Sequence, residues 1–213
     1  MKGEAMQNLT RRNLLGLLRL APAVPLAGHF LATPAFAAET DSSARALLQR
    51  RNFPNVKLQD QDGKNVRFYD DLIKDKIVTI NFFYAKCEGI CPTVTANLAK
   101  AQKILSDRVG REIFMTSISL KPEHDTPAVL KEYAEMFKAR PGWSFLTGKP
   151  DDVEHLRRSL GFTNLDPRLD KDTSQHIGNV RMGNEPLMIW AACPGMARPE
   201  FIAKSITWMI RKG

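Results

Sequence analysis

Two long apolar runs separated by helix-type amphipathic segments set the outline of this chain. Residues 77–84 and 112–119 are continuous enough in apolar character for strands that are buried on both faces. Before them, apolar and polar residues alternate on both sides of Asp62-Gly63, which predicts a hairpin over residues 56–68. Shorter strands are expected at residues 143–146, 178–182 and 187–191.

Proline marks the expected helix starts. Its missing N–H costs nothing in the first turn of a helix, where no intrahelical acceptor is available. Helices are predicted over residues 92–108, 127–139, 150–161 and 199–211, with a polar loop at 163–175. Strand–helix–strand–helix followed by a hairpin and a helix predicts an α/β fold. We expect a thioredoxin-like three-layer sandwich with an N-terminal hairpin and a central mixed sheet.

The first 37 residues read as an export signal and not as part of the fold. Residues 10–15 (TRRNLL) match a twin-arginine signal, an apolar stretch follows at 14–31, and Ala35-Phe36-Ala37 is a small-x-small cleavage site. Charged and proline residues interrupt the apolar stretch, so a permanent span is the less favoured alternative. We expect export to the periplasm, a flexible tether at 38–52 and one domain at 53–213. The alternative is a chain anchored to the inner membrane that faces the periplasm.

Net charge excludes one class of partner. The chain carries +8 at pH 7, but residues 1–37 hold four basic residues and one acidic residue, so the remainder carries +5. The remaining basic residues are scattered among acidic ones, without the basic stripe or stacking aromatics of a nucleic-acid binder. No nucleic-acid partner, and hence no DNA, is expected.

Cys87 and Cys91 lie where a predicted strand ends and a helix begins. Pro92 places Cys91 at or just before the helix N-terminus, where free amides and the helix dipole favour a thiolate. Two sulfurs on one short loop can bind a soft metal or form a disulfide, so a structural disulfide stays open. Cys193 is left over from any single pairing. It is a buried or idle thiol, or else a resolving thiol or third sulfur ligand.

Three sequence features resemble the Sco/SenC family of copper-binding, thioredoxin-fold proteins. They are residues 81–92 with Cys-x-x-x-Cys-Pro, residues 122–127 ending in Asp-Thr-Pro, and a lone His176 after a polar loop. The resemblance covers roughly residues 53–192. It implies copper delivery to cytochrome oxidase or general copper handling, sometimes with thiol–disulfide exchange.

The resemblance also implies that Cys87, Cys91 and His176 are the copper ligands. Cu(I) prefers thiolate and accepts imidazole, so Cu(I) is the favoured ion and Cu(II) the alternative. Zinc ranks lower because it usually takes a fourth ligand, and no fourth is evident. The leading hypothesis is a periplasmic metallochaperone, not an enzyme, that delivers copper to a cuproenzyme such as cytochrome c oxidase. Its partners would be an acceptor cuproprotein, such as an oxidase subunit, and a thiol reductant.

Two other functions remain open. In a thiol–disulfide oxidoreductase, Cys87 and Cys91 would be the catalytic pair and would act on the cysteines of a copper acceptor. A redox or copper sensor would use the same residues without a transfer step. Asp125 is most simply the cap of the helix that starts at Pro127, although it could instead orient the dithiol loop.

Overall fold

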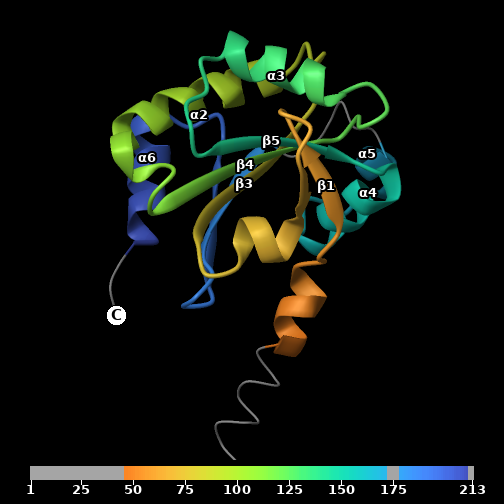
Figure 1. Cartoon of the computed structure of the whole chain (residues 1–213), viewed down its shortest axis with the longest axis horizontal. Helices are drawn as coiled ribbons and strands as arrows, with labels where there is room; N and C mark the ends of the chain where they lie inside the picture. The colour runs from red at the N-terminus through yellow and green to blue at the C-terminus, as the bar shows by residue number, and fades with distance from the viewer. Residues whose placement is uncertain (1–45, 172–177, 211–213) are drawn as a thin grey trace, which may run out of the picture. The chain divides into compact units, whose positions relative to one another are not determined.

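A single mixed sheet forms the centre of the molecule (Figure 1). The computed structural model describes residues 46–171 and 178–210, all of which belong to one compact unit. The strands in this part of the chain are β1 (Lys57–Asp60), β2 (Asn65–Arg67), β3 (Ile77–Phe83), β4 (Ile113–Ser119), β5 (Trp143–Gly148), β6 (Asn179–Asn184) and β7 (Ile189–Pro194). Their order in the sheet is β2-β1-β5-β4-β3-β6-β7.

Helices cover both faces of the sheet. They are η1 (Phe68–Ile73), α2 (Cys91–Leu105), η2 (Ser106–Arg108), α3 (Pro127–Met136), α4 (Pro150–Ser159), α5 (Pro167–Lys171) and α6 (Pro199–Trp208). One apolar cluster joins the sheet to α2, α3 and α6 through Leu98, Leu130 and Ile202. A second cluster joins the other face to η1 and α4 through Phe68 and Leu156. The predicted three-layer sandwich with its N-terminal hairpin is confirmed.

The direction of the strands fixes where the loops meet. Strands β3, β4 and β5 are parallel, whereas β1 runs antiparallel to β5 and β6 antiparallel to β3. The loop after β3 and the loop after β4 therefore leave the sheet at the same edge. The first of these loops holds Cys87 and the second holds Asp125.

Several boundaries differ from the sequence-based expectation. All four long helices have proline in the first turn, as predicted, but α2 begins at Cys91, one residue early. The π-helix η1 was not predicted, and α5 lies inside the expected polar loop. Strand β7 begins two residues late because Met188 adopts a positive φ of 53° in the turn before it. It also ends later than expected, at Pro194, and so includes Cys193.

The expected tether is described only from residue 46, and there it is helical over residues 46–52. Gln49 donates a hydrogen bond to Glu185 (2.5 Å), and the Phe53 ring packs against Trp190 with centroids 4.6 Å apart. The expected signal at 1–37 lies outside the described residues. No helix in the described ranges is long and apolar enough to cross a membrane.

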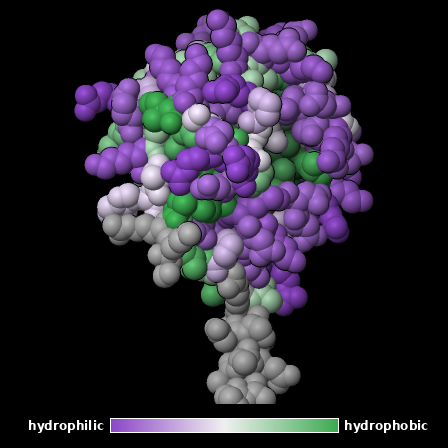
Figure 2. Space-filling view, turned by 60° about the vertical axis from the view of Figure 1, so that its left-hand side comes forward, coloured by the Kyte–Doolittle hydropathy of each residue, from purple (hydrophilic) through white to green (hydrophobic). Residues whose placement is uncertain are grey.

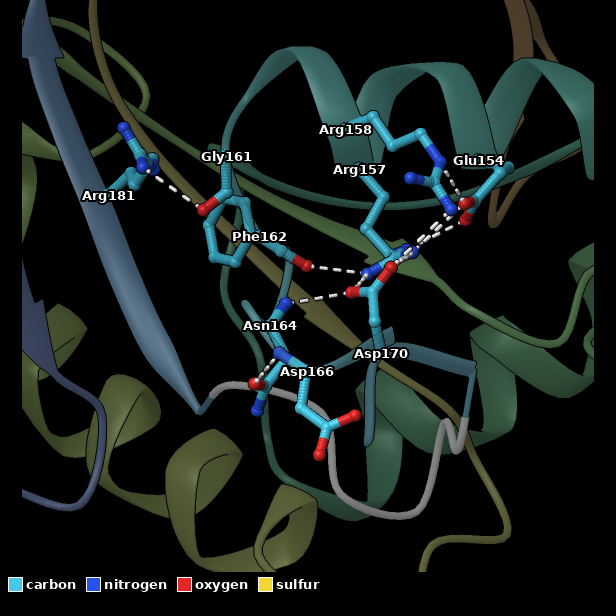
Figure 3. A network of polar contacts seen from close by, with 9 residues as sticks. All are labelled: Glu154, Arg157, Arg158, Gly161, Phe162, Asn164, Asp166, Asp170 and Arg181. Carbon is cyan, nitrogen blue, oxygen red and sulfur yellow. Dashed lines mark hydrogen bonds and ion pairs between the residues drawn. The ribbon is translucent and has the colours of Figure 1, made fainter. Parts of the chain in front are cut away.

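The face shown in Figure 2 is mostly hydrophilic, with hydrophobic patches. Elsewhere in the described chain, a buried ion pair holds the short helix α5 in place (Figure 3). The Arg157 guanidinium forms a bidentate pair with Asp170 (2.6 and 2.9 Å) and also contacts Glu154 and the Phe162 carbonyl. The Asn164 N–H donates to Asp170 (2.8 Å), so the carboxylate ties the loop after α4 to both helices.

Candidate metal centre

The two thiols lie side by side in the fold at the carboxyl edge of the parallel strands. Cys87 belongs to the loop after β3, where its N–H donates to the Tyr84 carbonyl (3.2 Å), and Cys91 is the first residue of α2. Their exposed fractions are 6% and 1%, and both are free thiols. The predicted position of this pair between a strand and a helix is confirmed.

The pKa values of the two thiols are shifted in opposite directions. Burial by itself would raise the pKa of Cys87, but hydrogen bonds with the Cys91 thiol, the Tyr84 side chain and the N–H groups of Cys91 and Gly89 bring it below its usual value. The pKa of Cys91 is raised, first by burial and then by its hydrogen bond with Cys87. The sequence had placed the favoured thiolate at Cys91. The free amides of a helix N-terminus do favour a thiolate, but here the Cys91 N–H donates its hydrogen bond to the sulfur of Cys87.

This asymmetry predicts an order of thiol reactivity. In reduced, metal-free protein, Cys87 is expected to react with iodoacetamide first and at lower pH than an ordinary thiol, because the thiolate is the nucleophile. Cys193 is expected to react only after unfolding, since it is buried and its pKa is raised to about 11. Peptide mapping after timed alkylation at several pH values measures this order. Labelling of Cys193 as fast as Cys87 would contradict it.

Asp125 supports the dithiol loop instead of capping a helix. Its buried carboxylate accepts hydrogen bonds from the Ala85 N–H (3.0 Å) and the Ser119 hydroxyl (2.5 Å). Thr126 caps α3 in its place, since its hydroxyl accepts from the Val129 N–H (3.4 Å). The expectation of a helix cap at Asp125 is therefore wrong, and the alternative role is the one observed. Ala85 lies two residues before Cys87, so this bond fixes the approach to the first thiol.

Tyr133 of α3 packs against the end of the strand that leads to Cys87. The sequence analysis did not identify it as part of the site. Its ring packs against Phe83 with centroids 4.9 Å apart, and its hydroxyl lies 3.0 Å from that of Thr95 on α2. Burial raises its pKa, and the charges of Cys91 and Cys87 add to this effect. Only its three-dimensional position marks Tyr133, because a tyrosine in an amphipathic helix is otherwise a packing residue.

Cys193 is a buried thiol on β7. It lies opposite Val180 on β6 and belongs to the same apolar cluster as the dithiol. Burial raises its pKa to about 11. This environment favours a packed, protonated thiol in the metal-free protein.

His176 lies outside the described residues. The described chain resumes at Gly178, whose backbone packs so closely on the residue before Cys91 that an added Cβ would lie 2.5 Å from the Cδ1 of Ile90. The Gly195 N–H donates to the Gly178 carbonyl (2.8 Å) and holds it there. Among the described residues no group of three or more His, Cys, Asp or Glu side chains is arranged to hold a metal ion.

Comparison with known proteins gives one consistent family. The SCO1/SenC family model matches residues 49–211. The SCO1 protein homolog of Bacillus subtilis is 36% identical over 91 residues, which cover 42% of this chain and 46% of that protein. SCO2 of Saccharomyces cerevisiae mitochondria is 35% identical over 120 residues, 56% of this chain and 38% of that protein. The matches span less than half the length of both relatives.

Solved structures share the fold. A SCO1/SenC family lipoprotein from Bacillus anthracis superposes with a TM-score of 0.63 at 23% identity, covering 76% of this chain and 96% of that one. ScoI of Bradyrhizobium japonicum with copper bound gives 0.60 at 24% identity, with 74% and 99% covered. BsSco, described with a disulfide switch and as a member of the Sco family of cytochrome c oxidase assembly proteins, gives 0.58 at 25%, with 74% and 94% covered. The predicted thioredoxin-like fold class is confirmed.

Proposed function

This chain belongs to the SCO1/SenC family, and from that membership we propose that it binds copper and delivers it to a cuproenzyme such as cytochrome c oxidase. The observation that carries the proposal is the buried pair of Cys87 and Cys91, in which hydrogen bonds lower the pKa of the Cys87 thiol. Soft sulfur donors of this kind suit Cu(I). Copper bound to ScoI of Bradyrhizobium japonicum and the cytochrome c oxidase assembly role of the family of BsSco support it.

His176 is the proposed third ligand. Gly178 lies against Ile90, and two residues of chain span at most about 7 Å, so the imidazole can reach the thiols from its place in the sequence. Two thiols and one imidazole leave an open side for the incoming ligand of an acceptor protein. Transfer by ligand exchange needs such an opening, because the ion then never becomes free.

Anaerobic titration of the reduced protein with Cu(I) tests the proposal. We expect one tightly bound Cu(I) per chain. A protein that binds no Cu(I) while its thiols remain reduced and its fold intact would reject the copper function.

The second candidate is thiol–disulfide exchange with the cysteines of a copper acceptor. The lowered pKa of Cys87 favours it, because exchange begins with attack by a thiolate, and Cys91 can then attack the mixed disulfide once its proton has left. The disulfide switch described for BsSco supports the same chemistry. A sensor role would use the same pair, with no observation that favours it over transfer.

Replacing His176 by alanine separates the two candidates. Copper affinity should fall at least about tenfold, since even the loss of a group that only orients a ligand costs that much. Exchange with a model disulfide should persist because it uses the thiols alone. His155→Ala, at an exposed position on α4, is the matched control and should change neither property. If His176→Ala lost exchange but kept its copper affinity, His176 would instead be assigned to thiol–disulfide exchange.

Replacing Asp125 by asparagine tests the support of the loop. An amide cannot accept as a charged carboxylate does from both the Ala85 N–H and the Ser119 hydroxyl, so the loop before Cys87 loosens. Cu(I) affinity is expected to fall about tenfold with unchanged stoichiometry. Glu123→Gln, at an exposed neighbouring position, should bind as the wild type does. Equal affinities in competition titrations of all three proteins would show that Asp125 has no such role.

Export by the twin-arginine route to the periplasm, with cleavage after Ala37, is part of the proposal. The TRRNLL motif and the small-x-small site support it. Substitution of Arg11 and Arg12 by lysine should retain the chain in the cytoplasm. N-terminal sequencing of the exported form would distinguish cleavage from an inner-membrane anchor.

A further inference from the structure

Strand β7 is an edge of the sheet that carries no charge. In the described part of the chain it pairs with β6 alone, so its outer edge has no neighbouring strand. Residues 189–194 include no acidic or basic side chain, and Ala191 and Ala192 are both exposed. Edge strands of natural proteins usually carry charges, bulges or a cover that prevents pairing. Here Pro194 at the end of the strand is the one such feature.

An apolar groove of about 340 Å³ lies between this strand and α6. Phe201, Ser205 and Trp208 follow the spacing of one helix face and line it. Phe201 is 52% exposed and Trp208 62% exposed, which is unusual for two large aromatic side chains on one stripe. The other lining residues are Met182, Ala191, Ala192, Lys204 and Met209.

We propose that this edge and groove form the interface between two copies of the chain, related by a two-fold axis, with β7 pairing antiparallel to β7 of the second copy. Antiparallel pairing of a strand with itself satisfies the free N–H and C=O groups of both copies at once. The small side chains of Ala191 and Ala192 allow the two strands to approach. The same rotation turns Phe201, in the first turn of α6, toward the last turn of α6 in the second copy, where Trp208 lies.

Charge favours a second copy over a partner with a strongly charged surface. Lys204 is the one charged residue among those that line the groove, and its long side chain can extend to solvent. A charged partner would bury its charges against an apolar face without compensation. A second copy presents an equally uncharged strand. The same surface on two copies is therefore complementary in both hydrogen bonding and polarity.

The two-fold axis of such a dimer stands perpendicular to the sheet. The carboxyl edges of the two sheets then lie at opposite ends, and both dithiol loops stay outside the interface. The dimer and the copper function can consequently be tested separately.

Sedimentation velocity of the full-length, reduced, copper-free protein tests the dimer. The wild type should self-associate with a dissociation constant on the order of micromolar, as expected for an interface of ordinary size. Ala192→Lys and Trp208→Lys should each weaken association at least about tenfold, because each places an unpaired charge in the interface. Leu47→Lys is the matched control, since Leu47 is exposed at 63% on the helix at 46–52, and should dimerise as the wild type does.

The outcomes are decisive in both directions. A wild type that stays monomeric at concentrations on the order of a hundred micromolar would overturn the proposal, as would groove variants that associate as tightly as the wild type. If Ala192→Lys fails to fold, Trp208→Lys still gives the comparison. A photo-crosslinking amino acid at position 201 should join two differently tagged copies in cells. Crosslinks to other proteins alone would overturn the choice of a second copy, whereas Cu(I) stoichiometry should be unchanged in every groove variant.

Discussion

Replacing Cys87 by alanine is expected to abolish tight Cu(I) binding. Cys87 is the thiol with the lowered pKa, so the variant loses the sulfur donor that ionises more readily than an ordinary thiol. Loss of a group that merely orients a ligand costs about tenfold to a hundredfold in metal affinity, and loss of a ligand itself should exceed this range. Anaerobic competition against a Cu(I) chelator measures the change.

The chain supplies its own control for this substitution. Cys193→Ala removes a buried thiol of the same apolar cluster that we do not assign to the centre. It should bind one Cu(I) with wild-type affinity, although it will be less stable because of the small cavity. Retention of tight binding in Cys87→Ala would reject the proposed centre. An equal loss in Cys193→Ala would instead make Cys193 the third sulfur ligand.

Replacing Asp170 by asparagine is expected to lower the free energy of unfolding by about 2–3 kcal/mol. The substitution removes a charged partner from Arg157, whose side chain is only 10% exposed, but Glu154 still contacts the guanidinium and limits the loss. Urea denaturation at pH 7 measures the difference. Asp166→Asn is the control, because its ion pair with Arg168 is exposed and should contribute little, and asparagine can still accept from the Arg168 N–H.

Acid should reduce the effect of this substitution. Hydrogen bonds from Arg157 and the Asn164 N–H hold the pKa of Asp170 well below its usual range, despite the opposing effect of burial. A carboxyl group whose pKa is lower in the folded state stabilises the fold above its unfolded pKa of about 3.9, and that stabilisation disappears as the pH falls toward the folded value. The gap between wild type and Asp170→Asn should therefore narrow between pH 5 and pH 3, which are about one unit above and below that pKa. A constant gap would show that the charge of Asp170 is not its cause.

Local patterns were sufficient for most of the fold. The apolar runs gave β3 and β4, and proline placed the starts of the long helices, because both signals depend on a few neighbouring residues. The π-helix η1 has no periodic pattern of its own. Helix α5 has a local start signal in Asp166-Pro167, where the Asp166 carboxylate accepts from the Arg168 N–H (2.9 Å), but the sequence analysis did not use it. Its tie to Arg157, 13 residues before Asp170, has no local signal.

The site was predictable in its residues but not in its electrostatics. The spacing of Cys87 and Cys91 before Pro92 identified the pair from sequence alone. The assignment of the thiolate was wrong, because it depends on which sulfur the amide of Cys91 faces. The role of Asp125 depends on two parallel strands that bring it beside Ala85, forty residues away in the chain. The place of His176 as a ligand remains a prediction from the family resemblance.

The close packing of Gly178 on Ile90 also constrains how this sequence can diverge. Any side chain at position 178 would need the terminal methyl group of Ile90 to move or to be lost. Homologues that carry alanine or serine at the equivalent of 178 should therefore show either another rotamer or a smaller side chain at the equivalent of 90. Position 90 immediately precedes Cys91. A substitution at the distant Gly178 would therefore affect the dithiol segment through the terminal methyl group of Ile90.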